Sequence, residues 1–154
     1  MNKALLLIQK YLLLFTVSGT AYYMIEIAWR GYSHISMFCL AGICGICIGL
    51  INEVFSMDTP IWLQAIIGSC IITIGEFISG CILNLWLNLQ IWNYSNMPFN
   101  VLGQICLPFS LLWVVLSAFV IIIDDYERYW FFGEEKPHYC WRFKEKKWKT
   151  YSLF

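Results

Sequence analysis

Four long blocks of apolar residues, separated by short polar stretches, dominate the hydropathy pattern of this chain. The blocks cover residues 11–28, 35–55, 61–87 and 105–123. A helix that crosses ~30 Å of hydrocarbon at a rise of ~1.5 Å per residue needs about 20 residues. Each block is therefore predicted to be a transmembrane helix, and the third, the longest, is expected to tilt or protrude. Because the blocks are continuously apolar rather than alternating, helices are favoured over barrel strands.

The composition places the chain in the same class. Its residues are 60% hydrophobic and 13% charged, whereas a soluble domain is roughly half apolar and about a quarter charged. The predicted fold is therefore an all-α polytopic membrane protein, with a helical domain over residues 1–123 and a tail over residues 124–154. Residues 1–10 are expected to form an interfacial lead-in. Gln9 and Lys10 interrupt the first apolar run, which favours a retained helix over a cleaved signal.

The basic residues predict an orientation. Nine of the ten Lys and Arg residues lie before the first block or after the fourth, and only Arg30 lies in the first or third loop. Cytoplasmic segments carry the excess of Lys and Arg. Four spans would place both ends of the chain on one side of the membrane, and the basic residues predict that this side is the cytoplasm.

Two connecting segments have unusual compositions. The third loop, residues 88–104, carries no formal charge but is rich in aromatic and amide side chains. We expect it to lie flat on the outer leaflet or to dip partly into the protein. The tail mixes acidic, basic and aromatic residues, with turn signals at Gly133 and Pro137. Its lysine cluster indicates either an interfacial tail on anionic headgroups or a docking surface for a cytoplasmic partner such as an ATPase. The cluster consists of Lys144, Lys146, Lys147 and Lys149.

One face of the third predicted helix carries small and polar residues. These residues fall within about 80° of one another on a helix of ~3.6 residues per turn; they are Ser69, Thr73, Glu76, Gly80 and Asn84. Glu76 lies near the centre of the span, where an ionisable group costs a few kcal/mol or more. This face is therefore expected to contact another helix or a water-filled path rather than lipid.

Further charged residues lie near the two membrane boundaries. Glu26 and Arg30 are spaced as an i, i+4 pair near the outer boundary, and Glu53 lies near the inner one. Together with Glu76 they predict a polar path for a cation or a proton. The alternative is that Glu76 is protonated or hydrogen-bonded and that the small residues only pack. The Gly45 to Gly49 interval is a GxxxG pattern that lets two helices approach closely.

The sequence offers little support for catalysis. Six of the seven cysteines lie in or beside the apolar blocks, where packing is expected, and the Cys44-Gly-Ile-Cys47 pair has no second pair to complete a zinc site. No histidine cluster, nucleophile elbow or phosphate-binding glycine loop is present. No catalytic, cofactor-binding or metal-binding residue is assigned, and no cofactor or nucleic acid is expected.

Several motifs resemble one known family. They are His34-Ile-Ser-Met-Phe38, Gly49-Leu-Ile-Asn-Glu53, Trp92-Asn-Tyr-Ser95, Pro98-Phe-Asn100, Gly103-Gln-Ile-Cys-Leu-Pro-Phe-Ser110 and Phe132-Gly-Glu-Glu-Lys-Pro-His-Tyr139. These segments are similar to the small bacterial membrane proteins called putative ABC transporter permeases, and the likeness covers nearly the whole chain. The resemblance marks as motif positions Glu26, Arg30, Asn52, Glu53, Glu76, Asn100, Gly103 and Gln104. Asn93 stands where that family usually has Asp, so a mechanism that relies on a carboxylate there is not expected.

The resemblance implies a multi-pass protein of the bacterial cytoplasmic membrane with both termini inside. The leading hypothesis is a membrane component of a transport system, with its substrate left open. The rival hypothesis is a non-transporting structural or regulatory protein that binds a partner through its tail, and an intramembrane enzyme is a third, weaker one. The expected partners are the lipid bilayer and either a separate ATPase subunit or a second copy of the chain.

Overall fold

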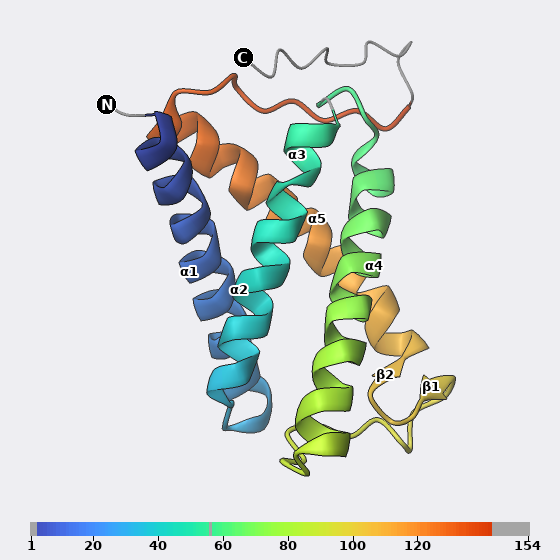
Figure 1. Cartoon of the computed structure of the whole chain (residues 1–154). Helices are drawn as coiled ribbons and strands as arrows, with labels where there is room; N and C mark the ends of the chain where they lie inside the picture. The colour runs from blue at the N-terminus through green and yellow to red at the C-terminus, as the bar shows by residue number, and fades with distance from the viewer. Residues whose placement is uncertain (1–2, 56, 143–154) are drawn as a thin grey trace.

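The computed structural model describes residues 3–55 and 57–142 and consists mainly of helices that run up and down in succession (Figure 1). The elements are α1 (Lys3–Arg30), α2 (Ile35–Gly49), α3 (Ile51–Val54), α4 (Ile61–Gly80), the π-helix η1 (Cys81–Trp86), β1 (Asn100–Val101), β2 (Ile105–Cys106) and α5 (Leu107–Phe132). The start of α1 and the end of α5 lie at the same end of the molecule, with α3. The third loop lies at the opposite end.

Three helical segments are long and apolar enough to cross a membrane. They are Leu5–Arg30, Ile61–Trp86 and Leu107–Phe132, with 26 residues each. At ~1.5 Å per residue each is roughly 39 Å long, more than the ~30 Å of hydrocarbon that a span must cross. The helical class predicted for the chain is therefore confirmed, and the segments predicted at 11–28, 61–87 and 105–123 fall within or closely overlap these helices.

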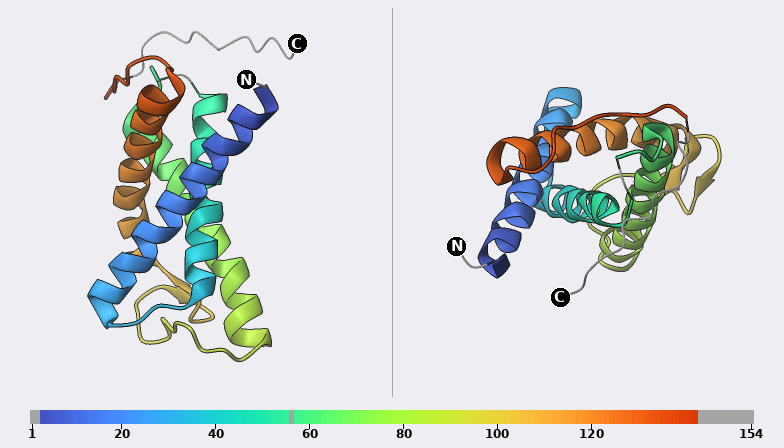
Figure 2. Two further views of the ribbon diagram at one scale, coloured as in Figure 1. Left: turned by 90° about the vertical axis from the view of Figure 1, so that its left-hand side faces the viewer. Right: turned by 90° about the horizontal axis from the view of Figure 1, so that it is seen from above.

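The second apolar block takes a different form. Its helix α2 has 15 residues and α3 follows as a separate short helix, so residues 35–55 are not one continuous span. α2 packs against α1, α4 and α5 and occupies the middle of the arrangement when seen from above (Figure 2). A complete crossing by this block, and so a total of four transmembrane helices, stays a prediction.

Two helices extend beyond their predicted ends. α1 begins at Lys3, so the predicted lead-in is helical from that residue onward, which agrees with the helix propensity of Gln and Lys. Its place at the membrane interface stays a prediction. α5 continues past Ile123 to Phe132, where Gly133 caps it in the left-handed conformation, φ +67°. The added turns of α5 carry Asp124, Asp125 and Arg128 as buried residues.

Close contact between α1 and α2 depends on glycine. A Cβ atom built on Gly42 would lie 2.6 Å from the ring of Phe15, and one built on Gly45 would collide with Ser18. On the next turn, Gly49 lies against Leu14 of α1 in the same way. The helix approach predicted from the GxxxG pattern is confirmed, with α1 as the partner helix.

The exposed surface of the long helices is apolar, and tryptophan marks their ends. Trp29 closes α1, Trp86 closes η1 and Trp130 lies in the last turn of α5, with 87%, 77% and 68% of their surface exposed. The ends of α1 and η1 lie at the end of the molecule that carries the third loop, and the end of α5 lies at the other end. Tryptophan is enriched at both membrane interfaces, so this arrangement fits a bilayer between the two levels.

Candidate functional site

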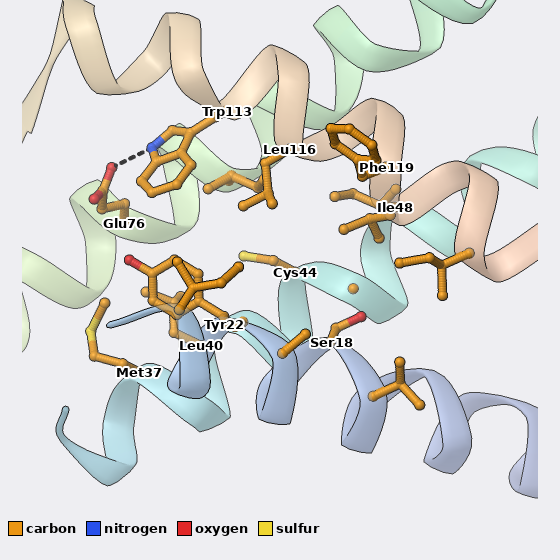
Figure 3. A pocket seen from close by; sticks show the side chains of 18 residues that line it. Ser18, Tyr22, Met37, Leu40, Cys44, Ile48, Glu76, Trp113, Leu116 and Phe119 are labelled. Carbon is orange, nitrogen blue, oxygen red and sulfur yellow. Dashed lines mark hydrogen bonds between the residues drawn. The ribbon is translucent and has the colours of Figure 1, made fainter. Parts of the chain in front are cut away.

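A cavity of about 410 Å³ lies among α1, α2, α4 and α5 (Figure 3). Most of its lining is apolar, with contributions such as Ile25, Ile48 and Phe119. Polar atoms come from a few side chains, which are Ser18, Tyr22, Cys44, Glu76 and Trp113. Ligand sites in proteins are commonly concave, mostly apolar and supplied with a few placed polar groups. The cavity therefore has the character of a binding site for a largely apolar molecule.

Glu76 is the single acidic residue in the lining of this cavity and lies near the middle of the Ile61–Trp86 span. Only 2% of the residue is exposed. Trp113 Nε1 donates to one carboxylate oxygen and the Tyr94 hydroxyl donates to the other, both at 2.9 Å. Both donors are neutral, and Glu76 forms no ion pair within residues 3–55 and 57–142. The carboxyl group therefore has hydrogen-bond partners but no partner cation.

Aromatic rings surround this carboxyl group. The ring centroid of Trp113 lies 6.0 Å from that of Tyr22 and 5.9 Å from that of Phe109. Tyr94 stacks on Phe109 at 4.6 Å. These separations are typical of aromatic pairs that contribute about 0.5–1.5 kcal/mol beyond their burial. The aromatic cluster fixes the two donors that hold Glu76.

The third loop reaches Glu76 because it folds back against the helix ends. Asn84 donates to the Gln104 side-chain oxygen at 2.9 Å and to the Trp92 carbonyl at 3.0 Å, and it accepts from the Ile91 backbone at 2.7 Å. Trp92 Nε1 donates to the Gln104 carbonyl at 2.9 Å. Ile91 and Trp92 are buried. The loop therefore packs into the protein, one of its two expected placements, and this packing brings Tyr94 to the carboxyl group.

The family-motif residues of this loop have structural roles. Asn100 donates to the Met97 carbonyl at 2.8 Å and accepts from the Gly103 backbone at 3.2 Å. Gly103 has φ +67°, and a Cβ there would lie 2.9 Å from the Asn93 side-chain oxygen. Asn93 accepts from Ser95, an acceptor role that the carboxylate of Asp would also fill. The motif position Asn52 lies in α3.

Glu26 and Arg30 close the outer end of α1. Their ion pair has a distance of 2.6 Å, which confirms the predicted i, i+4 pairing. Glu26 also accepts from the Ser33 hydroxyl, and Arg30 donates to the Ile91 carbonyl at 3.0 Å. This pair, the outer clasp, therefore ties α1 to the third loop. Its carboxylate already has a cation.

Lys10 belongs to a charged cluster at the inner end. Its ammonium group donates to Glu53 at 2.9 Å and to Glu134 at 2.8 Å. Burial by itself would raise the pKa of Glu53, but hydrogen bonds from Arg128 and Lys10 outweigh it and lower the pKa to about 2. Glu53 is therefore a charged residue near neutral pH and is held by two cations.

Arg128 completes this inner cluster, which consists of Lys10, Glu53, Asp124, Arg128 and Glu134. Its guanidinium donates to Asp124 at 2.7 Å and to Glu53 at 2.6 Å. It also donates to the Gly49 carbonyl at 2.8 Å. Only 3% of the Arg128 side chain is exposed. The cluster thus joins α1, α2, α3 and α5 beyond the inner limit of the cavity.

The structure therefore distributes the residues of the predicted polar path over separate environments. Glu76 lines the cavity, whereas the Thr73 hydroxyl donates to Ser110 of α5 at 3.2 Å and Asn84 belongs to the loop network. Glu26 and Arg30 form the outer clasp, and Glu53 belongs to the inner cluster. The α4 face is turned inward as expected, but only Glu76 from it lines the cavity.

Several residues of the site were missed by the sequence analysis. Tyr94 and Trp113 could not be assigned to Glu76, because nothing in their local pattern names a partner 18 or 37 residues away. Asp124 and Arg128 carry the same i, i+4 acid-before-base signal as Glu26 and Arg30. That signal was available but lay in the segment assigned to the tail.

Comparison with known families gives one match. The family described as "Putative ABC-transporter type IV" matches residues 11–129 of this chain. Comparisons with curated proteins and with solved structures give no match. Because the matched segment covers most of α1, all of α2, α3 and α4, and almost all of α5, the chain belongs to this family.

Proposed function

We propose that this member of the type IV family is a membrane-embedded component of a transport system and that the cavity beside Glu76 holds the transported species. The protein would reside in the bacterial cytoplasmic membrane, with the start of α1 and the end of α5 on the cytoplasmic side. The family match and the three long apolar helices support the membrane and transporter parts of this proposal.

The observation that carries the proposal is Glu76 itself. A carboxyl group at this depth is expensive unless it is neutralised, paired or used. Glu76 has two neutral hydrogen-bond donors and borders a cavity of about 410 Å³. A group with only a packing role would not need an adjacent cavity, which itself costs packing energy. The arrangement favours a site that alternates between an empty and an occupied state.

The two ends of the cavity suggest where such a site would open. Tyr94 and the outer clasp lie toward one membrane face, and the inner cluster lies toward the other. Release toward the cytoplasm would separate Arg128 from Glu53 or Lys10 from Glu134. Release toward the outside would withdraw Tyr94 from Glu76. Each barrier consists of a few hydrogen bonds or ion pairs, so each can open without unfolding a helix.

Energy coupling would come from another polypeptide. The chain has no phosphate-binding glycine loop, so ATP hydrolysis by the P-loop route requires a separate subunit. Residues after α5 cross the inner end and return to the start of α4, where Trp62 Nε1 donates to the Trp141 carbonyl at 3.1 Å. This segment, residues 133–142, offers a surface at which an ATPase subunit would bind.

The variant Glu76→Gln tests the transport proposal. It keeps the size of the side chain and its acceptor oxygen but removes the ability to ionise. Wild type and variant are expressed at matched membrane abundance in a strain that lacks the gene, and recovery of the strain's phenotype is measured. We expect a stable but inactive Gln variant, whereas Glu76→Leu should also lose stability because Tyr94 and Trp113 lose their acceptor.

The control is Glu127→Gln, the same chemical change at a partly exposed residue of α5 that lies outside the cavity lining, the outer clasp and the inner cluster, and it should behave as wild type. Full activity of the Gln variant at Glu76 would show that this carboxyl only packs, and the cavity would then have no part in transport.

The second candidate is a structural or regulatory membrane protein that binds a partner through its tail. It is supported by the same 133–142 segment, which Glu134 fixes to Lys10 and Cys140 fixes to the Ile61 backbone at 3.1 Å. The lysines at 144–149 lie outside the described residues. A chain ending at Arg142 removes the lysine cluster and separates the two functions, because binding through that cluster predicts loss of the phenotype while Glu76→Gln stays active.

A further inference from the structure

We propose that the cavity binds an apolar organic cation with a single positive charge. The charge would lie against the Glu76 carboxylate, and the apolar body would fill the space among α1, α2 and α5 (Figure 3). The proposal deepens the transport function by naming a substrate class, and its binding step can be measured without transport.

The charge requirement follows from the partners of Glu76. Trp113 and Tyr94 stabilise a carboxylate by donating to both of its oxygens, but neither neutralises it. Two other buried carboxylates differ in this respect, since Arg30 pairs with Glu26 and Arg128 pairs with Asp124. Removal of one partner from a buried ion pair typically costs about 3–5 kcal/mol because the remaining charge is uncompensated. A cationic ligand would supply the missing partner at Glu76.

The apolar requirement follows from the cavity walls. Besides Glu76, the polar side chains in the lining are two hydroxyls, a thiol and the Trp113 indole N–H, which already donates to Glu76. These groups cannot replace the hydration shell of a sugar, a phosphate or a small inorganic ion. An anion would face the Glu76 charge. The volume of about 410 Å³ lies within the range of about 300–1,000 Å³ that is common for small-molecule sites. One charged group on a bulky hydrocarbon body matches the walls and the carboxylate together.

Aromatic side chains favour a cation over a neutral molecule of the same size. Tyr22, Trp113 and Phe119 all line the cavity, and Tyr22 lies beside Trp113, which holds Glu76. The faces of such rings attract cations within about 6 Å, with roughly 2 kcal/mol or more when the pair is desolvated. A lipid acyl chain could fill the apolar volume, but it would leave both the carboxylate and these ring faces without a charge to bind.

The test measures binding of tetraphenylphosphonium to the purified full-length protein in nanodiscs of neutral lipid by equilibrium dialysis. Tetraphenylborate, an anion of nearly the same shape, is the matched ligand control. We expect the cation to bind saturably and the anion not to compete. Glu76→Gln should weaken cation binding by at least about tenfold, the equivalent of 1.4 kcal/mol. Glu127→Gln should bind like wild type, and Glu76→Asp, which keeps the charge, should retain most of the affinity.

Equal binding of cation and anion, or equal cation affinity in the wild type and Glu76→Gln, would overturn the proposal and leave an acyl-chain cavity as the explanation. Absence of saturable cation binding to a correctly folded wild type would also overturn it. The outcome for transport is separate. Saturable, Glu76-dependent binding together with full recovery of the phenotype by Glu76→Gln would leave this inference standing and remove the transport function, whereas an inactive Glu76→Gln variant without cation binding to the wild type would do the reverse.

Discussion

Replacement of Arg128 by Met should strongly destabilise the inner end of the protein. The guanidinium donates to Asp124, Glu53 and the Gly49 carbonyl, and 3% of the Arg128 side chain is exposed. Met keeps much of the apolar stem but removes every donor. Asp124 is 1% exposed, so its carboxylate would lose a buried cationic partner. The expected loss is about 3–5 kcal/mol of unfolding free energy.

The corresponding change at the outer clasp provides a comparison. The Arg30 and Glu26 side chains are 22% and 11% exposed, and Glu26 keeps the Ser33 hydroxyl as a donor. Arg30→Met should therefore be less damaging than Arg128→Met. In the double variant Asp124→Asn with Arg128→Met, the uncompensated charge disappears and part of the lost stability should return.

The assay is the midpoint of thermal unfolding in detergent, followed by tryptophan fluorescence, for the wild type, the two single Arg variants and the double variant. For the expected free-energy loss, the midpoint of Arg128→Met should fall by on the order of 10 °C. The reasoning is refuted if Arg128→Met unfolds at the wild-type midpoint. It is also refuted if the double variant is no more stable than Arg128→Met alone, because the damage would then not come from an uncompensated Asp124.

Three further predictions concern orientation, the tail and pH. A reporter fused after Phe154 should be on the cytoplasmic side and one inserted at Asn96 on the external side; an external signal from the first fusion contradicts the proposed orientation. A peptide of residues 138–154 should bind anionic vesicles and dissociate at high salt, with about 1 kcal/mol from each Lys near the surface, and equal binding to neutral vesicles would favour docking to a protein. Hydrogen bonds and cations lower the folded-state pKa of Glu53 to about 2. The ion pairs of Glu53 therefore contribute their full stability above about pH 4.3, the ordinary Glu pKa, and this stability is lost as the pH falls toward 2. Acid unfolding curves should therefore be shallower for Glu53→Gln than for wild type, and identical pH dependence of the two would contradict the assignment.

The helices and the inward face of α4 could be predicted because hydrocarbon length and the cost of exposed polar groups act on local sequence. Glu76 can be recognised in the sequence because it is a charged residue type in an apolar block. The Glu26–Arg30 ion pair can be recognised by its i, i+4 helical spacing. The extent of α5 could not be predicted in the same way, because Asp124 and Arg128 look like residues leaving the membrane. Their burial becomes acceptable only through partners such as Glu53, which lies 75 residues from Arg128 along the chain.

The immediate surroundings of Glu76 required the structure for a similar reason. The third loop has the composition of an interfacial segment, and composition does not specify its path. Positive φ angles at Asn88, Phe99, Leu102 and Gly103 fold it back on itself. That path delivers Tyr94 to the carboxyl group. The cavity could not be foreseen either, because it results from the packing of four helices rather than from any one of them.

The length of α2 has a consequence for how the chain is assembled in the membrane. With 15 residues it reaches about 22 Å at ~1.5 Å per residue, less than the hydrocarbon thickness that a lone helix must cross. Its buried residues contact α1, which is synthesised before it, and also α4 and α5, which are synthesised after it. During synthesis α2 must therefore remain with α1, or with an insertion factor, until the second half of the chain arrives. A nascent chain that ends before α5 would leave this helix without part of its final environment and expose it to membrane proteases.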